Sequence, residues 1–379
     1  MSSSSEIRAK HAEYISKAAG TYYDESIVLD YGNGARVTDL EGTEYLDFFG
    51  GILTVSVGHN NRAVSEAVSQ QVRRLSHVSA LYPTVPMVTL AERLAQVTPG
   101  SLKKSFFTAS GTEANETAVM LAQISTGNTE LIALRHGYSG RSMLAQSLTA
   151  QSTWRVLPTQ VAGIKHAHAP YCYRCPFGKK PDSCGMACAK DIEELIQTTT
   201  TGRIAGMLVE PILGVGGFIV PPKDYFKVAS DIIRKYGGMF IADEVQTGFA
   251  RTGKMWGIEN FDVEPDMMTM AKGIANGLPL GAVIATPAVA DSLTKPSVST
   301  YGGNPISTAA ANAVMDEIQN NDLPGNCRVQ GQRLRAGLEA IQRKHPRIIG
   351  DVRGMGLMQA LELVSDETAG DRTPNVAAK

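Results

Sequence analysis

The sequence lacks any apolar stretch that approaches the roughly 20 residues needed to cross a lipid bilayer. It also lacks a surplus of charge, since 36 basic residues stand against 37 acidic ones and the net charge is -1. A chain without a strong field of one sign has no general means of attracting nucleic acid or an anionic membrane surface. We therefore expect neither nucleic acid nor a membrane among its partners, and chemistry on a small molecule is favoured.

The opening residues, MSSSSEIRAK, lack the apolar core of a secretory signal peptide. A cytoplasmic location is the expectation, and a mitochondrial one stays open for a eukaryotic chain whose presequence has been removed. Hydrophobic residues make up 43% of the chain and charged residues 19%, with 37 glycines. This composition is typical of a soluble α/β enzyme and not of a disordered or fibrous protein.

Cysteine is scarce, but four of the five cysteines form two close pairs, Cys172 with Cys175 and Cys184 with Cys188. Pairs at this spacing are typical of zinc ligands, because a tetrahedral ion needs four soft ligands from two short turns. A disulfide in an oxidising compartment and a plain surface loop interrupted by prolines are the alternatives. We predict no metal among the functional residues and leave the role of these cysteines open.

The order of predicted elements favours an α/β fold with a mainly parallel sheet. Short apolar strands, such as residues 131–134, 206–209 and 239–242, alternate with segments of helix length. Two alternating runs around a glycine predict a hairpin over residues 34–47. A chain of 379 residues is also longer than one hydrophobic core usually serves, so we expect a large domain with a smaller companion.

The apolar spacing predicts two further helices, over residues 61–75 and 306–319. Glycine, proline and serine gather just before the second of these, which marks a change of domain. We therefore predict a small α+β domain built from both chain ends, residues 1–75 and 310–379, around a large domain of residues 76–309.

The segment SGTEAN, residues 110–115, follows a strand-like run and opens an apolar helix. Unpaired backbone N–H groups and the positive end of the helix dipole suit phosphate, Gly111 permits close approach, and Ser110 and Thr112 add hydroxyl groups. The same pattern is also that of an ordinary helix N-cap. Taken alone, it is a weak prediction of a phosphate site.

Two apolar strands each deliver a chemically active group at the carboxyl end. Asp243, Glu244 and Gln246 follow the strand 239–242, where binding crevices of open α/β sheets form. Such an acid can ligate a metal, act as a base, pair with a cationic ring nitrogen, or only cap the next turn. Lys272 closes another strand against a loop rich in glycine, where desolvation lowers its pKa and favours imine formation. A surface lysine with a buried stem is the alternative.

The predicted phosphate site at residues 110–115, the acid Asp243 and Lys272 follow one another in this order, and in this the chain resembles the class III aminotransferases of fold type I. The match runs from about residue 23 to 363, with its strongest blocks at 110–115, 241–253 and 271–281. It is similar in particular to the alanine-glyoxylate and β-alanine-pyruvate aminotransferases. The resemblance implies a transaminase that uses pyridoxal 5'-phosphate and forms a homodimer with shared active sites.

The resemblance also implies roles for individual residues. Lys272 would form a Schiff base with the cofactor and move the substrate proton, and Asp243 would keep the ring nitrogen protonated. Thr300 would reach the cofactor phosphate of the neighbouring subunit. The full set of implied cofactor-binding residues is Ser110, Gly111, Thr112, Tyr138, Asp243, Gln246, Lys272 and Thr300.

Substrate choice is less defined. Arg141 matches an arginine that relatives use on a distal carboxylate, with a surface position as the alternative, and Glu210 matches an acid beside the cofactor, with turn capping as the alternative. Relatives that act on 4-aminobutyrate or ornithine carry a gating glutamate where this chain has Val215. The family also has a further segment with the arginine that grips the α-carboxylate, expected after Leu363, so the sequence looks truncated at its C-terminus.

The function that the resemblance implies is transfer of an amino group from alanine, β-alanine or a similar donor to glyoxylate or pyruvate. The first alternative is a lyase or decarboxylase on the same cofactor, because such relatives share the phosphate site, the acid and the lysine. The second is a protein without enzymatic activity.

Overall fold

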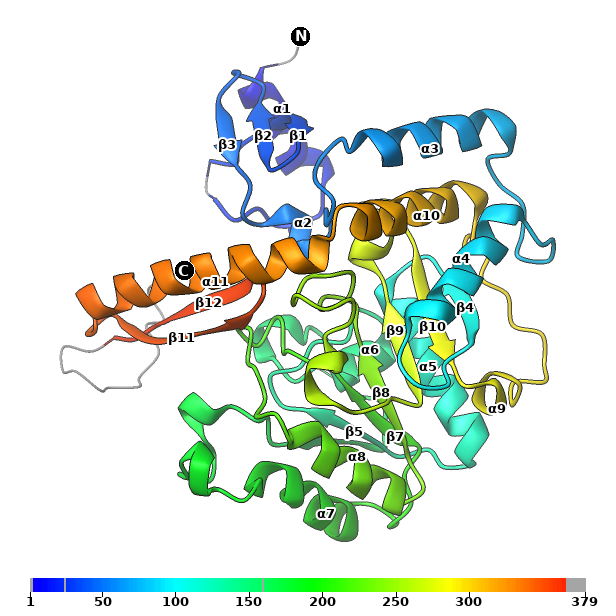
Figure 1. The fold of residues 1–379 in the computed structure, drawn as a ribbon, viewed down its shortest axis with the longest axis vertical. Helices are drawn as coiled ribbons and strands as arrows, with labels where there is room; N and C mark the ends of the chain where they lie inside the picture. Colours follow the sequence, from blue (N-terminus) through cyan, green and yellow to red (C-terminus); the bar gives the residue numbers. More distant parts are fainter. Residues whose placement is uncertain (1–2, 24, 159, 366–379) are drawn as a thin grey trace.

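A computed structural model describes residues 3–23, 25–158 and 160–365. Its centre is a seven-stranded sheet in the order β4-β10-β9-β8-β7-β5-β6, which confirms the predicted mainly parallel α/β arrangement (Figure 1). Only β10 runs against both of its neighbours. The strands are β4 (Lys104–Thr108), β5 (Leu131–Leu134), β6 (Ile164–Ala167), β7 (Gly206–Val209), β8 (Met239–Asp243), β9 (Met267–Met270) and β10 (Gly281–Ala285).

The strands of this sheet are continuous apolar runs because helices cover both faces. On β7, for example, all four residues are buried, and Met207 and Leu208 belong to two different core clusters. The larger cluster joins the sheet to α4 (Val85–Val97), α7 (Ala187–Thr199), α8 (Tyr225–Lys235) and α10 (Pro305–Asn320). The smaller joins it to α5 (Gly111–Thr126), α6 (Met143–Leu148) and α9 (Pro287–Ala290).

Both ends of the described chain lie outside this sheet (Figure 1). The N-terminal part comprises α1 (Ser4–Tyr14), a small sheet of β1 (Leu29–Asn33), β2 (Arg36–Asp39) and β3 (Glu44–Leu46), and α2 (Gly50–Leu53). Strands β2 and β3 are antiparallel, which confirms the predicted hairpin. The C-terminal part comprises α11 (Leu323–Lys344), β11 (Ile349–Met355) and β12 (Met358–Leu363).

The helix α3 (Arg62–Arg74) packs on α10, and both match the predicted helices to within one residue at each end. Helix α10 contributes Val314 and Ile318 to the larger core cluster. The predicted domain boundary after residue 309 falls inside this helix, and residues 366–379 of the predicted last part lie outside the described residues. The division into domains stays a prediction.

The C-terminal sheet is fastened to the large sheet's loops by one polar cluster. Glu362 on β12 accepts hydrogen bonds from Tyr171, Arg174 and Arg353. The Arg353 guanidinium lies 5.1 Å from the centre of the Tyr171 ring, and its Nε donates to the backbone oxygen of Gly217 at 2.7 Å. A residue of β11 therefore holds the loop that follows β7.

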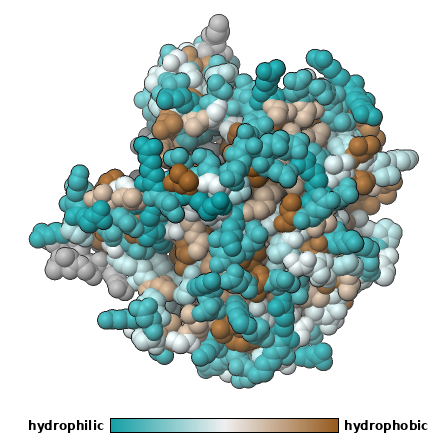
Figure 2. Space-filling view, viewed as in Figure 1, coloured by the Kyte–Doolittle hydropathy of each residue, from teal (hydrophilic) through white to brown (hydrophobic). Residues whose placement is uncertain are grey.

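The molecular surface is mainly hydrophilic on the face drawn in Figure 2, with apolar side chains scattered among the polar ones. Large exposed apolar residues recur at the turn from α3 into α4, where Leu81 is 71% and Val85 73% exposed. Among the described residues, no helix combines the length and the apolar character needed to cross a membrane.

The packing of α8 gives a direct test of the core. Its Ile233 is fully buried against the sheet, whereas Asp231 on the same helix is exposed. We expect Ile233→Ala to lower the free energy of unfolding by about 2 to 5 kcal/mol, because transfer energy and cavity cost add. Asp231→Ala should change it by no more than about 0.5 kcal/mol. Urea unfolding of both variants makes the comparison, and equal losses would contradict this account of the core.

Candidate active site

A cavity of about 160 Å³ opens at the carboxyl end of β8 and β9, under the start of α5. Parallel strands that end at the same edge bring their terminal side chains together, which is where open α/β sheets form their binding crevices. Residues from five separate stretches of the chain meet here. They are Gly111, Thr112, Asn115, Tyr138, Ser139, Gly140, Glu210, Val215, Asp243, Val245, Gln246, Ala271 and Lys272.

The first turn of α5 forms one wall of the cavity through Gly111 and Thr112. Ser110 is the N-cap, and its hydroxyl accepts a hydrogen bond from the backbone N–H of Glu113. The capping interpretation is therefore correct for Ser110, which does not line the cavity. The free N–H groups and the dipole at this helix end still favour an anion.

Asp243 and Lys272 face the same cavity from neighbouring strands. Asp243 ends β8 and is 4% exposed, and Lys272 follows β9 at the start of a 3-10 turn, Lys272–Ala275. Burial lowers the pKa of Lys272, and the charges of Asp243 and Glu210 oppose that shift. Burial raises the pKa of Asp243, against the hydrogen bonds from Asn115 and from the backbone of Val245. An amine whose pKa is lowered and a buried acid thus line one cavity.

The backbone at Lys272 is itself unusual. Its φ angle is 49°, in the left-handed region that side chains with a Cβ rarely adopt. Residues held in such conformations need support from their surroundings, and they cluster at functional sites. The turn at Lys272 is thus fixed by its packing and not by the preference of the residue.

Gln246 carries the clearest sign that the cavity is built for another molecule. Its side chain is 9% exposed and lines the cavity, yet Oε1 is buried without a hydrogen-bond partner among the described residues. Gly214 lies so close that a Cβ there would collide with this amide. Val215, the next residue, also lines the cavity.

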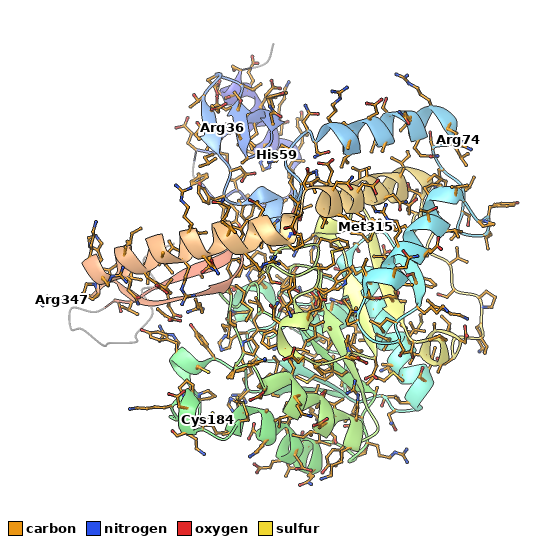
Figure 3. The ribbon with its side chains drawn as sticks, viewed as in Figure 1. Arg36, His59, Arg74, Cys184, Met315 and Arg347 are labelled. Carbon is orange, nitrogen blue, oxygen red and sulfur yellow. The ribbon has the colours of Figure 1, made fainter. Side chains whose placement is uncertain are left out.

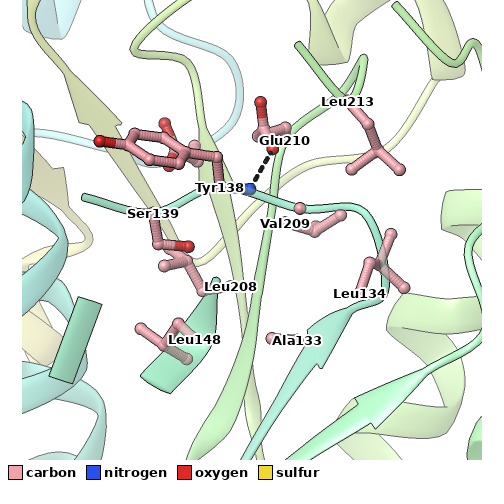
Figure 4. A pocket seen from close by; sticks show the side chains of 11 residues that line it. Ala133, Leu134, Tyr138, Ser139, Leu148, Leu208, Val209, Glu210 and Leu213 are labelled. Atoms are coloured by element: carbon pink, nitrogen blue, oxygen red, sulfur yellow. Dashed lines mark hydrogen bonds between the residues drawn. The ribbon is translucent and has the colours of Figure 1, made fainter. Parts of the chain in front are cut away.

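Glu210 binds two loops at once. Its Oε1 accepts from the backbone N–H of Tyr138 at 3.0 Å, as Figure 4 shows, and its Oε2 accepts from Gly214 at 2.8 Å. Burial raises the pKa of Glu210 to about 8, and the charge of Asp243 adds to the effect. The carboxyl group therefore caps two turns and also lines the cavity, while its place beside a cofactor stays a prediction.

The other predicted residues divide between cavity and surface. Tyr138 is half-buried and lines the cavity, with its ring 5.9 Å from the ring of Trp154 in an edge-to-face contact. Arg141 is exposed, and its backbone N–H donates to the hydroxyl of Thr112. Thr300 is exposed and does not line the cavity of its own chain.

The four paired cysteines converge on a second, much smaller cavity beside α7. They are free thiols. Burial raises the pKa of Cys188 to about 11, and the neighbouring cysteines add a smaller effect in the same direction. Cys184 marks this cluster at the outer end of the molecule in Figure 3. Within the described ranges, no group of three or more His, Cys, Asp or Glu side chains is placed to hold a metal ion.

The sequence did not single out Asn115 as a functional residue, although a signal was present. Asn115 stands four residues after Gly111, so the two lie on the same face of α5. A helix whose first residue faces a ligand presents its fifth residue to the same side. Ser139 and Gly140 follow Tyr138 and have no periodic signal, so only the fold brings them to the cavity.

Comparison with known proteins places these features in a family. The aminotransferase class-III family model matches residues 18–378. Alanine-glyoxylate aminotransferase 2 homolog 2, mitochondrial, of Arabidopsis thaliana is 44% identical over 372 residues, which cover 98% of this chain and 76% of the relative.

Two solved structures are also similar to this chain. An (S)-enantioselective omega-transaminase from Thermomicrobium roseum superposes with a TM-score of 0.91 at 32% identity, covering 99% of this chain and 87% of the neighbour. An amine transaminase from an uncultivated Pseudomonas species, solved in its PLP-bound form, gives 0.87 at 33% identity, covering 93% and 84%. These similarities confirm the predicted fold of the transaminases of fold type I.

The buried carboxyl group of Glu210 predicts a pH dependence. Its raised pKa means that the folded protein retains a proton that the unfolded chain releases above about pH 4.5, so the free energy of unfolding falls between about pH 4.5 and 8. We expect Glu210→Gln to be less stable than the unchanged protein at acid pH, since an amide cannot accept from both N–H groups. As the pH rises from about 4.5 to 8, its free energy of unfolding should fall by about 2 to 4 kcal/mol less than that of the unchanged protein.

Urea unfolding at pH 5 and at pH 8.5 measures this difference. Glu92→Gln, on the exposed face of α4, serves as the control and should keep the pH dependence of the unchanged protein. Parallel pH profiles for the unchanged protein and Glu210→Gln would show that this group does not titrate with folding.

Proposed function

This chain belongs to the class-III aminotransferases, and from that premise we propose that it transfers an amino group from alanine, β-alanine or a similar amine to glyoxylate or pyruvate. The observation that carries the proposal is the partly buried Lys272 together with the buried Asp243 in one cavity under the start of α5. A desolvated lysine, an acid and an anion-binding helix end are the groups that a phosphorylated aldehyde cofactor needs.

The cofactor that these residues fit is pyridoxal 5'-phosphate. Lys272 would hold it covalently through the ε-amine, Gly111 and Thr112 would hold its phosphate, and Asp243 would bind its ring nitrogen. The unpartnered Oε1 of Gln246 would accept a hydrogen bond from the ring hydroxyl, which would give this buried atom the partner that it lacks among the described residues. The similar Pseudomonas amine transaminase was solved with this cofactor bound.

When bound, this cofactor supplies an electron sink for the negative charge left on the substrate carbon after its proton is removed. Lys272 would take that proton with its neutral amine and return it to the cofactor, since burial already favours the uncharged form. Asp243 would keep the ring nitrogen protonated, and Tyr138 would cover the ring face. The half-buried Tyr138 is held in place by the hydrogen bond between its backbone and Glu210.

Several features bear on the choice of substrate. Val215 puts an apolar side chain on the cavity wall where relatives acting on 4-aminobutyrate or ornithine have a glutamate, which favours a small donor. The exposed position of Arg141 leaves it free to meet a donor that carries a second carboxylate. A lyase or decarboxylase receives no support from the similar proteins described above, which are named as aminotransferase or transaminase.

We further propose that two copies of the chain share their active sites. Thr300 lies on the surface, as it must if it serves the cofactor of a second copy. The exposed apolar residues at the turn from α3 into α4 offer a surface for such contact. We propose a cytoplasmic location. A mitochondrial one is the alternative, because the Arabidopsis relative is named as mitochondrial.

A panel of amines tests the function. Purified protein with bound cofactor is mixed with alanine, β-alanine, 3-aminoisobutyrate and a longer ω-amine, first alone and then with glyoxylate or pyruvate. The donor that changes the cofactor absorbance fastest identifies the amine, and product amino acid should form only when a 2-oxo acid is added. Product that forms at full rate without any acceptor would instead favour a lyase.

Replacing the lysine tests the mechanism. We expect Lys272→Ala to reduce amino transfer by about 100- to 10,000-fold, because the group that moves the substrate proton is lost. The visible absorbance of covalently bound cofactor should also disappear. Lys223→Ala, at an exposed position that forms an ion pair with Asp262, should retain both. Unchanged turnover in Lys272→Ala would contradict the proposed role of Lys272.

A further inference from the structure

Asn115 stands at a junction of three elements of the site. Its Nδ2 donates to Asp243 Oδ2 at 2.8 Å and to the backbone oxygen of Ser139 at 2.9 Å. Its Oδ1 accepts from the hydroxyl of Thr269 at 2.7 Å. Asn115 is 2% exposed and Thr269 is fully buried, so water does not compete for these bonds. One amide therefore links α5, the end of β8, β9 and the loop that carries Tyr138.

The register of the sheet creates this arrangement. Asp243 and Thr269 are direct partners in the parallel pair of β8 and β9, so both side chains point to the face that α5 covers. Strands are about 4.8 Å apart, a gap that one amide group can bridge. Asn115 spans it from above, with its nitrogen toward the acid and its oxygen toward the hydroxyl.

The orientation of the amide follows from its partners. A carboxylate and a carbonyl oxygen only accept hydrogen bonds, so both must meet the NH₂ group, whose two protons are then fully used. Turning the amide round would set its oxygen against both of these acceptors. The Thr269 hydroxyl, which donates to Oδ1, adds a third contact that only this orientation satisfies.

We propose that Asn115 is a positioning residue that aims the Asp243 carboxylate at the cofactor ring nitrogen, and that Thr269 keeps the Asn115 amide the right way round. The proposal rests on the function proposed above. Asn115 holds Oδ2, while the backbone N–H of Val245 holds Oδ1 at 3.0 Å. With both oxygens held, the carboxylate plane is fixed, and its remaining lone pairs have set directions.

The same amide sets the position of the ring-covering residue relative to the acid. Ser139, whose backbone oxygen it binds, is the neighbour of Tyr138. Three titratable groups interact electrostatically with Asp243, namely Lys272, Glu210 and Glu244. Burial raises the pKa of Asp243, so a donor that favours its ionised form is needed to offset that burial.

A matched pair of variants at Thr269 tests the proposal with little change of volume. Thr269→Val removes the hydroxyl, and Thr269→Ser keeps it. With saturating alanine, we expect the rate at which the absorbance of bound cofactor changes to fall about 3- to 10-fold in Thr269→Val, as for loss of one neutral hydrogen bond. Thr269→Ser should stay within about 2-fold of the unchanged protein. Identical rates in the two variants would overturn the role of the hydroxyl.

Asn115→Ala tests the junction itself. Here the same rate should fall about 10- to 100-fold, because a hydrogen bond to a charged group is lost. The pH at which the absorbance of the bound cofactor changes should move upward, since a less protonated ring repels the proton on the Lys272 nitrogen less. Asn312→Ala, which removes one part-buried hydrogen bond from α10 to Pro86 of α4 and one to Thr308 within α10, is the control and should leave that pH unchanged.

The outcomes separate this inference from the proposed function. An unchanged protein that neither binds the cofactor nor transfers amino groups would overturn both. An active protein in which Asn115→Ala loses only thermal stability, with the pH profile of the cofactor unaltered, would overturn the positioning role alone. Should Asn115→Ala fail to fold, the comparison of Thr269→Val with Thr269→Ser still decides.

Discussion

The candidate site depends on one constraint, which is that Asp243 and Lys272 line one cavity and are both withdrawn from solvent in part or in full. Burial opposes the charged form of each group, and the opposite charge of the other favours it. The sheet provides the arrangement because β8 and β9 are parallel neighbours that end at one edge. Helix α5 closes that edge with its N-terminus and with Asn115. The helix end that suits an anion thus belongs to the same element that holds the acid.

The sequence predicts those parts of the molecule whose signals are local and periodic. Strands β5 and β7 and the helices α3 and α10 appear within a residue of their predicted ends, because each buries a regular apolar face. The meeting of Asp243 and Lys272 also follows from sequence, since both close apolar strands and parallel strands end together. The segment 110–115 predicts a phosphate site only in combination with these two residues, because on its own Ser110 predicts a helix cap.

The remaining features depend on contacts between distant segments, which no local pattern records. Asn115 lies 128 residues from Asp243 in sequence and 154 from Thr269. Glu210 accepts from Tyr138, 72 residues away, so its two roles could not be separated in advance. The left-handed backbone at Lys272 is likewise imposed by packing, because an isolated lysine would avoid it.

The contact between Arg353 and Gly217 has a consequence for the order in which the site is assembled. Gly217 lies two residues beyond Val215, which forms part of the cavity wall, and Arg353 is its hydrogen-bond donor. A ribosome makes Arg353 after every residue that lines the cavity. The hydrogen bonds from Asn115 to Asp243 and from Thr269 to Asn115 join residues that are all made before β11. The bond that holds Gly217 beside the cavity can form only after β11 has been made.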